Sequence, residues 1–283
     1  MNPTTAAVRA GVSRGWTELR NSFANWQDLW GYFFPTAILL IVMFFMRNST
    51  VPGTTFSLGT RTLPSTLGMG LAFTGMVGVA QQLLVEREDG TLLRAKAVPN
   101  GMLGYLIGKV VSIACVALIG LVLQVVPATL FLHGLAIHGV GGWLTLLWVV
   151  VLGLLATLPI GAVLGSLFED ARNFGLIVLP IMGSIAISGI FYPINSLPGW
   201  VQAVGQALPI YWLGLGMRSA LLPDGMAAVE LGHSWRHLET ALALGVWAVL
   251  GLVLAPVVLR RMARRESGSR VAARREKAMQ RVN

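Results

Sequence analysis

Six long apolar stretches divide the chain, and shorter polar segments separate them. A bilayer core about 30 Å thick needs roughly 20 apolar residues in each helix that crosses it. We therefore predict six transmembrane helices, at residues 30–46, 65–85, 102–131, 143–167, 174–192 and 240–259. The pattern indicates an all-α polytopic membrane protein, and the even number of spans places both termini on one side.

An amphipathic helix is predicted before the first span. Its apolar residues recur at spacings of three and four, which keeps them on one helical stripe. The stripe comprises Val12, Trp16, Leu19, Phe23, Trp26 and Trp30. Tryptophans on one face and charges on the other suit a helix that lies in the headgroup layer of a membrane. Packing of the stripe against the rest of the protein would produce the same pattern.

Composition and charge agree with a membrane protein and orient it. The chain is 55% hydrophobic and only 12% charged, with a mean hydropathy of +0.70, which excludes an ordinary soluble domain. Of the 21 Lys and Arg residues, 17 fall on the face that carries both termini, so the positive-inside rule makes that face cytoplasmic. The domains expected are a cytoplasmic segment at 1–29, a transmembrane domain at 30–259 and a basic cytoplasmic tail at 260–283.

The longest outward segment, residues 193–239, is predicted to form a short helical cap. Pro193, Pro198 and Pro209 punctuate it, and each proline ends or starts a helix. One short helix fits between the last two, with Tyr211 and Trp212 at interface depth. Such a cap would be re-entrant or lie on the surface, because it is too short to cross. On the opposite side, the basic tail is expected to contact anionic lipid, and no fold signal supports nucleic-acid binding.

The sequence LVEREDGTLLRAKAVP, at residues 84–99, places six ionisable groups between two apolar regions. It predicts a turn: the second span runs to about Asp89, Gly90 adopts the left-handed conformation, Thr91 caps a short helix and Pro99 stops it. Acidic residues are disfavoured at a helix C-terminus. Glu86 and Glu88 are therefore expected to meet a basic partner, either Arg94 and Lys96 within the loop or another protein.

At these residues the sequence resembles the permease subunits of ABC-2 type exporters, particularly the daunorubicin/doxorubicin-resistance-like permeases. The shared pattern is Glu-Arg-Glu, one variable residue, Gly-Thr-Leu, then basic residues and a proline. It is matched by Glu86, Arg87, Glu88, Gly90, Thr91, Leu92, Arg94 and Pro99. The resemblance implies that residues 86–99 couple the permease to a separate ATPase, present in two copies, in a bacterial plasma membrane. ATP and Mg would bind to that partner, with no cofactor on this chain.

Other chemistries find less support in the sequence. The closest approach to a Walker A motif, GYLIGKV at 104–110, has three residues between its glycines instead of four, so no ATP hydrolysis is expected on this chain. The His233 and His237 pair has helical metal-ligand spacing but no third ligand, and no metal site is expected. Ser188 in the fifth span lacks a base at its depth, which disfavours a hydrolase.

The spans contain almost no ionisable groups away from their ends, which disfavours a proton-driven carrier and favours apolar or amphipathic cargo. By resemblance to the family, the substrate path would be lined by residues of the second and fifth spans. These are Met69, Phe73, Met76, Ser184, Ser188 and Phe191. Ordinary helix packing is the alternative role for each of them.

Small residues spaced four apart permit close helix contacts, at Gly104 and Gly108 and at Gly161 and Gly165, either within one chain or between two. We expect a second permease copy or a paralogue in the complex. The function expected is export of a hydrophobic or amphipathic, drug- or antibiotic-like compound. The alternatives are a lipid or lipid-linked glycan exporter and a membrane scaffold or sensor that does not transport.

Overall fold

A computed structural model describes residues 3–51, 56–98, 100–135, 139–168 and 174–265. Helices account for the secondary structure of these residues, and no strand occurs among them beyond one isolated bridge between Thr50 and Ser57. The all-α class is therefore confirmed. The α-helices are α1 (Pro3–Ala24), α2 (Trp26–Met46), α3 (Leu58–Phe73), α4 (Val79–Glu88), α5 (Thr91–Lys96), α6 (Gly101–Ala128), α7 (Val140–Leu167), α8 (Phe174–Ala186), α9 (Gly199–Ala207), α10 (Pro209–Leu221) and α11 (His237–Arg265). A π-helical segment, η1 (Thr74–Gly78), joins α3 to α4, and three 3-10 turns follow α8: η3 (Ile194–Ser196), η4 (Asp224–Val229) and η5 (Leu231–His233).

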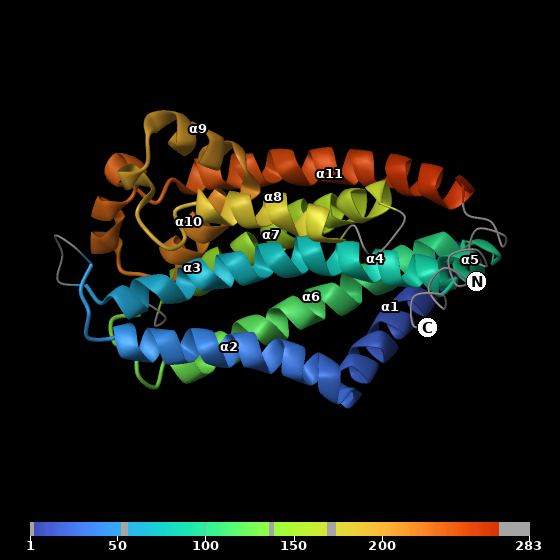
Figure 1. The fold of residues 1–283 in the computed structure, drawn as a ribbon, viewed down its shortest axis with the longest axis horizontal. Coiled ribbons are helices and arrows are strands. Elements are labelled where there is room, and N and C mark those ends of the chain that lie inside the picture. The colour runs from blue at the N-terminus through green and yellow to red at the C-terminus, as the bar shows by residue number, and fades with distance from the viewer. Residues whose placement is uncertain (1–2, 52–55, 99, 136–138, 169–173, 266–283) are drawn as a thin grey trace.

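The long helices lie side by side in an elongated bundle (Figure 1). In the described part of the chain, 5 of them are long and apolar enough to cross a membrane: Leu29–Met46, Leu58–Glu88, Gly101–Ala128, Val140–Leu167 and His237–Met262. The fifth predicted span differs from the prediction. Its helix, α8, has 13 residues and ends at Ala186, where a turn through Gly189 (φ 68°) begins. At 1.5 Å per residue, α8 is about 20 Å long, too short to cross by itself.

The two ends of the bundle differ in content. One end, here the α5 end, holds α5, the start of α1 and the end of α11; the α9 end holds α9, η4, η5 and the close of α2 (Figure 1). The first and last described helices thus reach the same end of the bundle, which is the arrangement expected when both termini lie on one side of a membrane.

Helix α10 changes the interpretation of residues 193–239. The short helix between Pro198 and Pro209 is present as α9, but α10 then enters the bundle, and all its residues except Ser219 are buried. Tyr211 and Trp212 are 0% and 5% exposed, so both side chains pack inside the bundle, while their depth in a membrane stays a prediction. The physical reason is that α10 is apolar on every side and must be covered all round.

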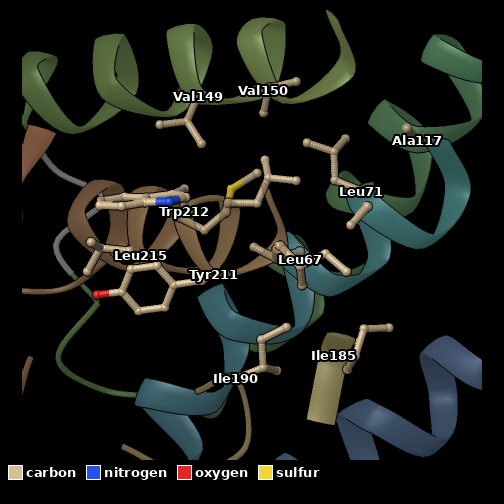
Figure 2. Packing of buried hydrophobic residues seen from close by; sticks show 14 of the residues in the cluster. Leu67, Leu71, Ala117, Val149, Val150, Ile185, Ile190, Tyr211, Trp212 and Leu215 are labelled. Atoms are coloured by element: carbon tan, nitrogen blue, oxygen red, sulfur yellow. The ribbon is translucent and has the colours of Figure 1, made fainter. Parts of the chain in front are cut away.

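The core forms where α10 meets α3 and α7. Figure 2 shows Trp212 and other side chains of α10 facing Leu67 and Leu71 of α3 and Val149 of α7. A close approach of backbones accompanies this packing, since a Cβ atom added to Gly68 of α3 would lie 2.9 Å from the Cα of Gly214 in α10. Residues 193–239 therefore include a helix that builds the core, in addition to the short helix α9.

Both predicted pairs of small residues pack within the chain. Gly104 and Gly108 of α6 face α1, where a Cβ added to Gly15 would lie 2.6 Å from the Gly108 carbonyl oxygen. Gly161 and Gly165 of α7 face η1 and α4 in the same way, with a Cβ on Gly165 reaching within 2.8 Å of the Cα of Ala80. These four glycines thus pack against other helices of the same subunit.

The amphipathic N-terminal helix is shorter than its predicted stripe. It ends at Ala24, and the Asn25 side chain accepts a hydrogen bond from the Gln27 N–H at 3.1 Å to cap α2. Trp26 therefore begins the first spanning helix, together with Trp30, because a capping Asn interrupts the helical period there. On α1 itself the apolar residue Trp16 is 64% exposed, while the opposite face packs along α6.

Candidate coupling and transport sites

The turn predicted between the second span and a short helix is present. Helix α4 ends at Glu88, Gly90 is left-handed with φ 78°, and α5 begins at Thr91. The capping group differs from the prediction: the Asp89 carboxylate accepts the Thr91 N–H at 2.7 Å, and Thr91 is the first helical residue. An Asp readily binds the backbone two residues on, and this contact frees the Thr91 hydroxyl to accept from Arg94 at 2.8 Å.

Glu86 and Arg87 point toward the bundle. Glu86 lies 2.6 Å from the Lys109 ammonium and accepts a hydrogen bond from the Tyr105 hydroxyl at 2.5 Å, both on α6. The Arg14 guanidinium of α1 approaches the same carboxylate at 3.7 Å. Arg87 is 3% exposed and donates to the Phe168 carbonyl at 2.5 Å, just beyond α7. These two side chains fasten the end of α4 to three other helices.

The contacts of Glu86 belong to a larger ion-pair network that joins α1, α4 and α6. Glu18 of α1 lies 2.7 Å from Arg14 and 2.9 Å from Lys109, and Lys109 also donates to Gln82 of α4 at 3.1 Å. Partial burial alone would raise the pKa of the Glu18 carboxyl, but the hydrogen bond from Arg14 and the charge of Lys109 outweigh burial and hold that pKa below its ordinary value. The network borders an open polar crevice of about 410 Å³ between α1, α4 and α6.

Helix α5 has one buried and one exposed face. Leu92 and Ala95 are 1% and 9% exposed and pack with Tyr105 of α6 and with Leu259 and Met262 of α11. Arg94, Lys96 and Val98 are exposed at the end of the bundle. Glu88 is half-buried, and Pro99, which also belongs to the motif, lies outside the described residues. The motif thus divides into inward residues that anchor α5 and outward residues that a partner can reach.

Comparison with known proteins agrees with this architecture. A family model described as "ABC-2 family transporter protein" matches residues 17–258 of the chain.

The chain belongs to the ABC-2 transporter family.

It is accordingly a permease, the membrane subunit of an ABC transporter, with several apolar helices that cross a membrane. A comparison with curated proteins finds no match. The matched residues include α2 to α10, the motif at 86–98 and most of α11, so these helices belong to the transporter domain.

The six candidate path residues of the permease differ in burial. Phe73 and Phe191 are 38% and 54% exposed on the outside of the bundle, whereas Met76 and Ser188 are buried. Met69 and Ser184 are half-buried, and none of the six borders the polar crevice. Ser188 follows the end of α8, and its hydroxyl donates to the Ile185 carbonyl at 2.6 Å, a local contact that satisfies this buried group.

The histidine pair does not share a helix face. His233 lies in η5 and His237 begins α11, with a left-handed Arg236 (φ 47°) between them. Among the described residues no group of three His, Cys, Asp or Glu side chains has the geometry of a metal site.

A buried ionic cluster near the α9 end escaped the sequence analysis, which assigned its arginines to outer loops. Arg61 of α3 and Arg218 of α10 are 3% and 1% exposed, and both contact Glu230, which is 2% exposed and lies between η4 and η5. Arg218 also donates to the Ser65 hydroxyl of α3 at 3.1 Å. The available signal was the position of Arg218 within an apolar helical stretch, IYWLGLGMRSALL, where a lone charge needs a buried partner.

Proposed function

We propose that this permease exports a hydrophobic or amphipathic, drug-like compound from the cytoplasm or inner leaflet of a bacterial plasma membrane. Two separate ATPase subunits, which bind ATP and Mg, would drive export. The observation that carries the proposal is the placement of α5: one face is fixed on α4, α6 and α11, and the other presents Arg94, Lys96 and Val98 at the end of the bundle. A short helix held in this way can transmit a movement of a docked subunit to the three helices that it contacts.

The contacts of the motif suggest a division of labour. Glu86 and Arg87 hold the end of α4 against α6 and the close of α7, while Gly90 sets the angle between α4 and α5. The exposed basic residues Arg94 and Lys96 would then meet acidic groups of the ATPase. The inward residues would fix the helix, so that Arg94 and Lys96 present their charges to the ATPase in a constant position.

The distribution of apolar surface supports a second permease copy or a paralogue beside this one. Only 6% of the apolar window of α2 is buried inside the chain, so lipid or another subunit must cover it. Phe73 and Phe191 are exposed on the bundle surface. A path lined by these residues would form between two permeases.

Co-purification tests the docking surface. We would isolate the tagged permease from its native membranes in mild detergent and identify bound chains by mass spectrometry. An ATPase should accompany the wild type and be lost from Arg94→Glu/Lys96→Glu. The control Arg20→Glu, which changes an exposed basic residue on α1, should retain it. Retention by the double variant, or absence of any ATPase from the wild type, would contradict the proposal.

Transport itself needs a separate measurement. The purified complex, reconstituted in liposomes, should hydrolyse ATP faster in the presence of apolar cationic or neutral drugs and should move them across the bilayer. A complex that binds its ATPase yet moves no apolar compound and no lipid would be a scaffold or a sensor. Orientation is tested in the cysteine-free background, where Ser196→Cys should react with an impermeant reagent from outside and Ser13→Cys should not.

A further inference from the structure

The cluster of Arg61, Arg218 and Glu230, taken by itself, has two cations and one anion and therefore a net positive charge. All three side chains are at most 3% exposed. A guanidinium does not lose its proton in a protein, so burial cannot neutralise either arginine. Nearby, Arg236 pairs with Glu239 at 3.5 Å, and the Asp224 carboxylate accepts the neutral Trp235 indole N–H at 3.3 Å.

The Glu230 carboxylate is shared unevenly between the two arginines. Arg218 takes both oxygens of Glu230, with Nε 2.9 Å from Oε1 and Nη2 3.1 Å from Oε2, and it has the Ser65 hydroxyl as well. Arg61 reaches the same carboxylate only at 3.5 Å. Arg61 is therefore the cation that lacks a full counter-charge.

Buried donors in the cluster also lack acceptors. The Nε of Arg61 is inaccessible and has no hydrogen-bond partner, and the Nε of Arg218 makes no hydrogen bond either, although it lies 2.9 Å from a Glu230 oxygen. Buried donors are nearly always paired in proteins, so a missing acceptor and a missing negative charge occur in one place.

We propose that the permease binds a small inorganic anion of the size of chloride beside Arg61. A monovalent anion would bring the cluster to neutrality and accept the Nε–H of Arg61. The ligand must be small because the residues around it are almost fully enclosed. Glycine at position 214 belongs to the same enclosure, since a Cβ atom there would lie 3.2 Å from Nη1 of Arg218. The bound anion would brace α3 against α10 and the η4–η5 link.

Anion-dependent stability tests this site. The midpoint of thermal unfolding, followed by tryptophan fluorescence, should rise and saturate as chloride replaces gluconate at constant ionic strength. Bromide should act like chloride. The Arg61→Met permease, which retains the neutral Arg218–Glu230 pair, should lose this dependence and unfold no earlier than the wild type in gluconate. Arg47→Met is the matched control, because Arg47 is exposed beside the Phe44 ring, and it should keep the dependence.

Several results would overturn the proposal. The first is that the unfolding midpoint of the wild type does not change with chloride, and the second is that chloride stabilises Arg61→Met equally. The third is that acidic phospholipid in chloride-free buffer stabilises the wild type as much as chloride does. If Arg61→Met fails to fold, anomalous diffraction from bromide-soaked wild-type crystals decides. A peak beside Arg61 supports the site, and peaks only elsewhere mean an adventitious ion only. None of these results depends on cargo or on the ATPase.

Discussion

The contact between Glu86 and Lys109 gives a quantitative prediction. The Glu86 and Lys109 side chains are 13% and 12% exposed, and their charged atoms lie 2.6 Å apart. At this burial, solvent screening is weaker than at an exposed pair, whose contribution is about 0–1 kcal/mol. A hydrogen bond between charged groups contributes about 1.5–3 kcal/mol. We therefore expect a coupling free energy of about 2 kcal/mol, or roughly 30-fold in the folding equilibrium.

A double-mutant cycle isolates that coupling from the other contacts of each residue. Glu86→Gln, Lys109→Met and the double variant are unfolded in mixed micelles, and the free energies of unfolding are compared. The double variant should lose about 2 kcal/mol less than the sum of the single variants. The contact of Lys109 with Glu18 is lost equally in Lys109→Met and in the double variant, so it cancels.

A second cycle supplies the refutation. If Glu86 instead paired with the basic residues of its own loop, Glu86→Gln and Arg94→Met would show a coupling of similar size. The structure places Arg94 on the Thr91 hydroxyl, so we expect these two substitutions to be additive within about 0.5 kcal/mol. Coupling with Arg94, or a Glu86–Lys109 coupling below about 0.5 kcal/mol, would show that the α1–α4–α6 network is not formed.

Three further predictions concern packing, pH and the buried cluster. Gly15→Ala should lower the free energy of unfolding by about 1–3 kcal/mol, because its Cβ would lie 2.6 Å from a carbonyl oxygen of α6, whereas Gly31→Ala, with no atom within 4 Å of its Cβ, should be neutral or stabilising. The folded pKa of Glu18 is held below its ordinary value of 4.5, so its contribution to stability is present above that pH and is lost as the pH falls through the folded pKa. The acid titration of the unfolding midpoint should therefore be flatter in Glu18→Gln than in the wild type. Glu230→Gln should lower the free energy of unfolding by about 3–5 kcal/mol, because it leaves two buried guanidiniums without their carboxylate. The control Glu239→Gln changes a side chain that is 50% exposed and should lower it by less than about 1 kcal/mol. Equal effects of the two substitutions would contradict the buried cluster.

The sequence alone determined the class of the protein and its local signals. A long apolar stretch of sequence predicts a membrane helix by itself, so the spans at 102–131 and 143–167 could be located from the sequence to within a few residues. The turn at Gly90 was equally accessible, because a glycine after an acidic helix end and before a capped helix is a local signal. The motif at 86–94 also led to the family that the comparison shows.

Tertiary structure decided how each element is used. Period and composition say that a face is apolar, but they do not say whether lipid or another helix covers it. This is why the sequence predicted an outer cap at 193–239, re-entrant or surface-lying, and not that α10 is buried in the core. In the same way, sequence gives the charge of Glu86 and of Arg61 but not the direction of either side chain. Charges far apart in the chain find each other only when helices pack: Glu86 meets Lys109, and Arg61 meets Glu230. Burial and pairing are properties of that packing, so the ion-pair network at the α5 end and the buried cluster near the α9 end belong to the fold and not to any stretch of sequence.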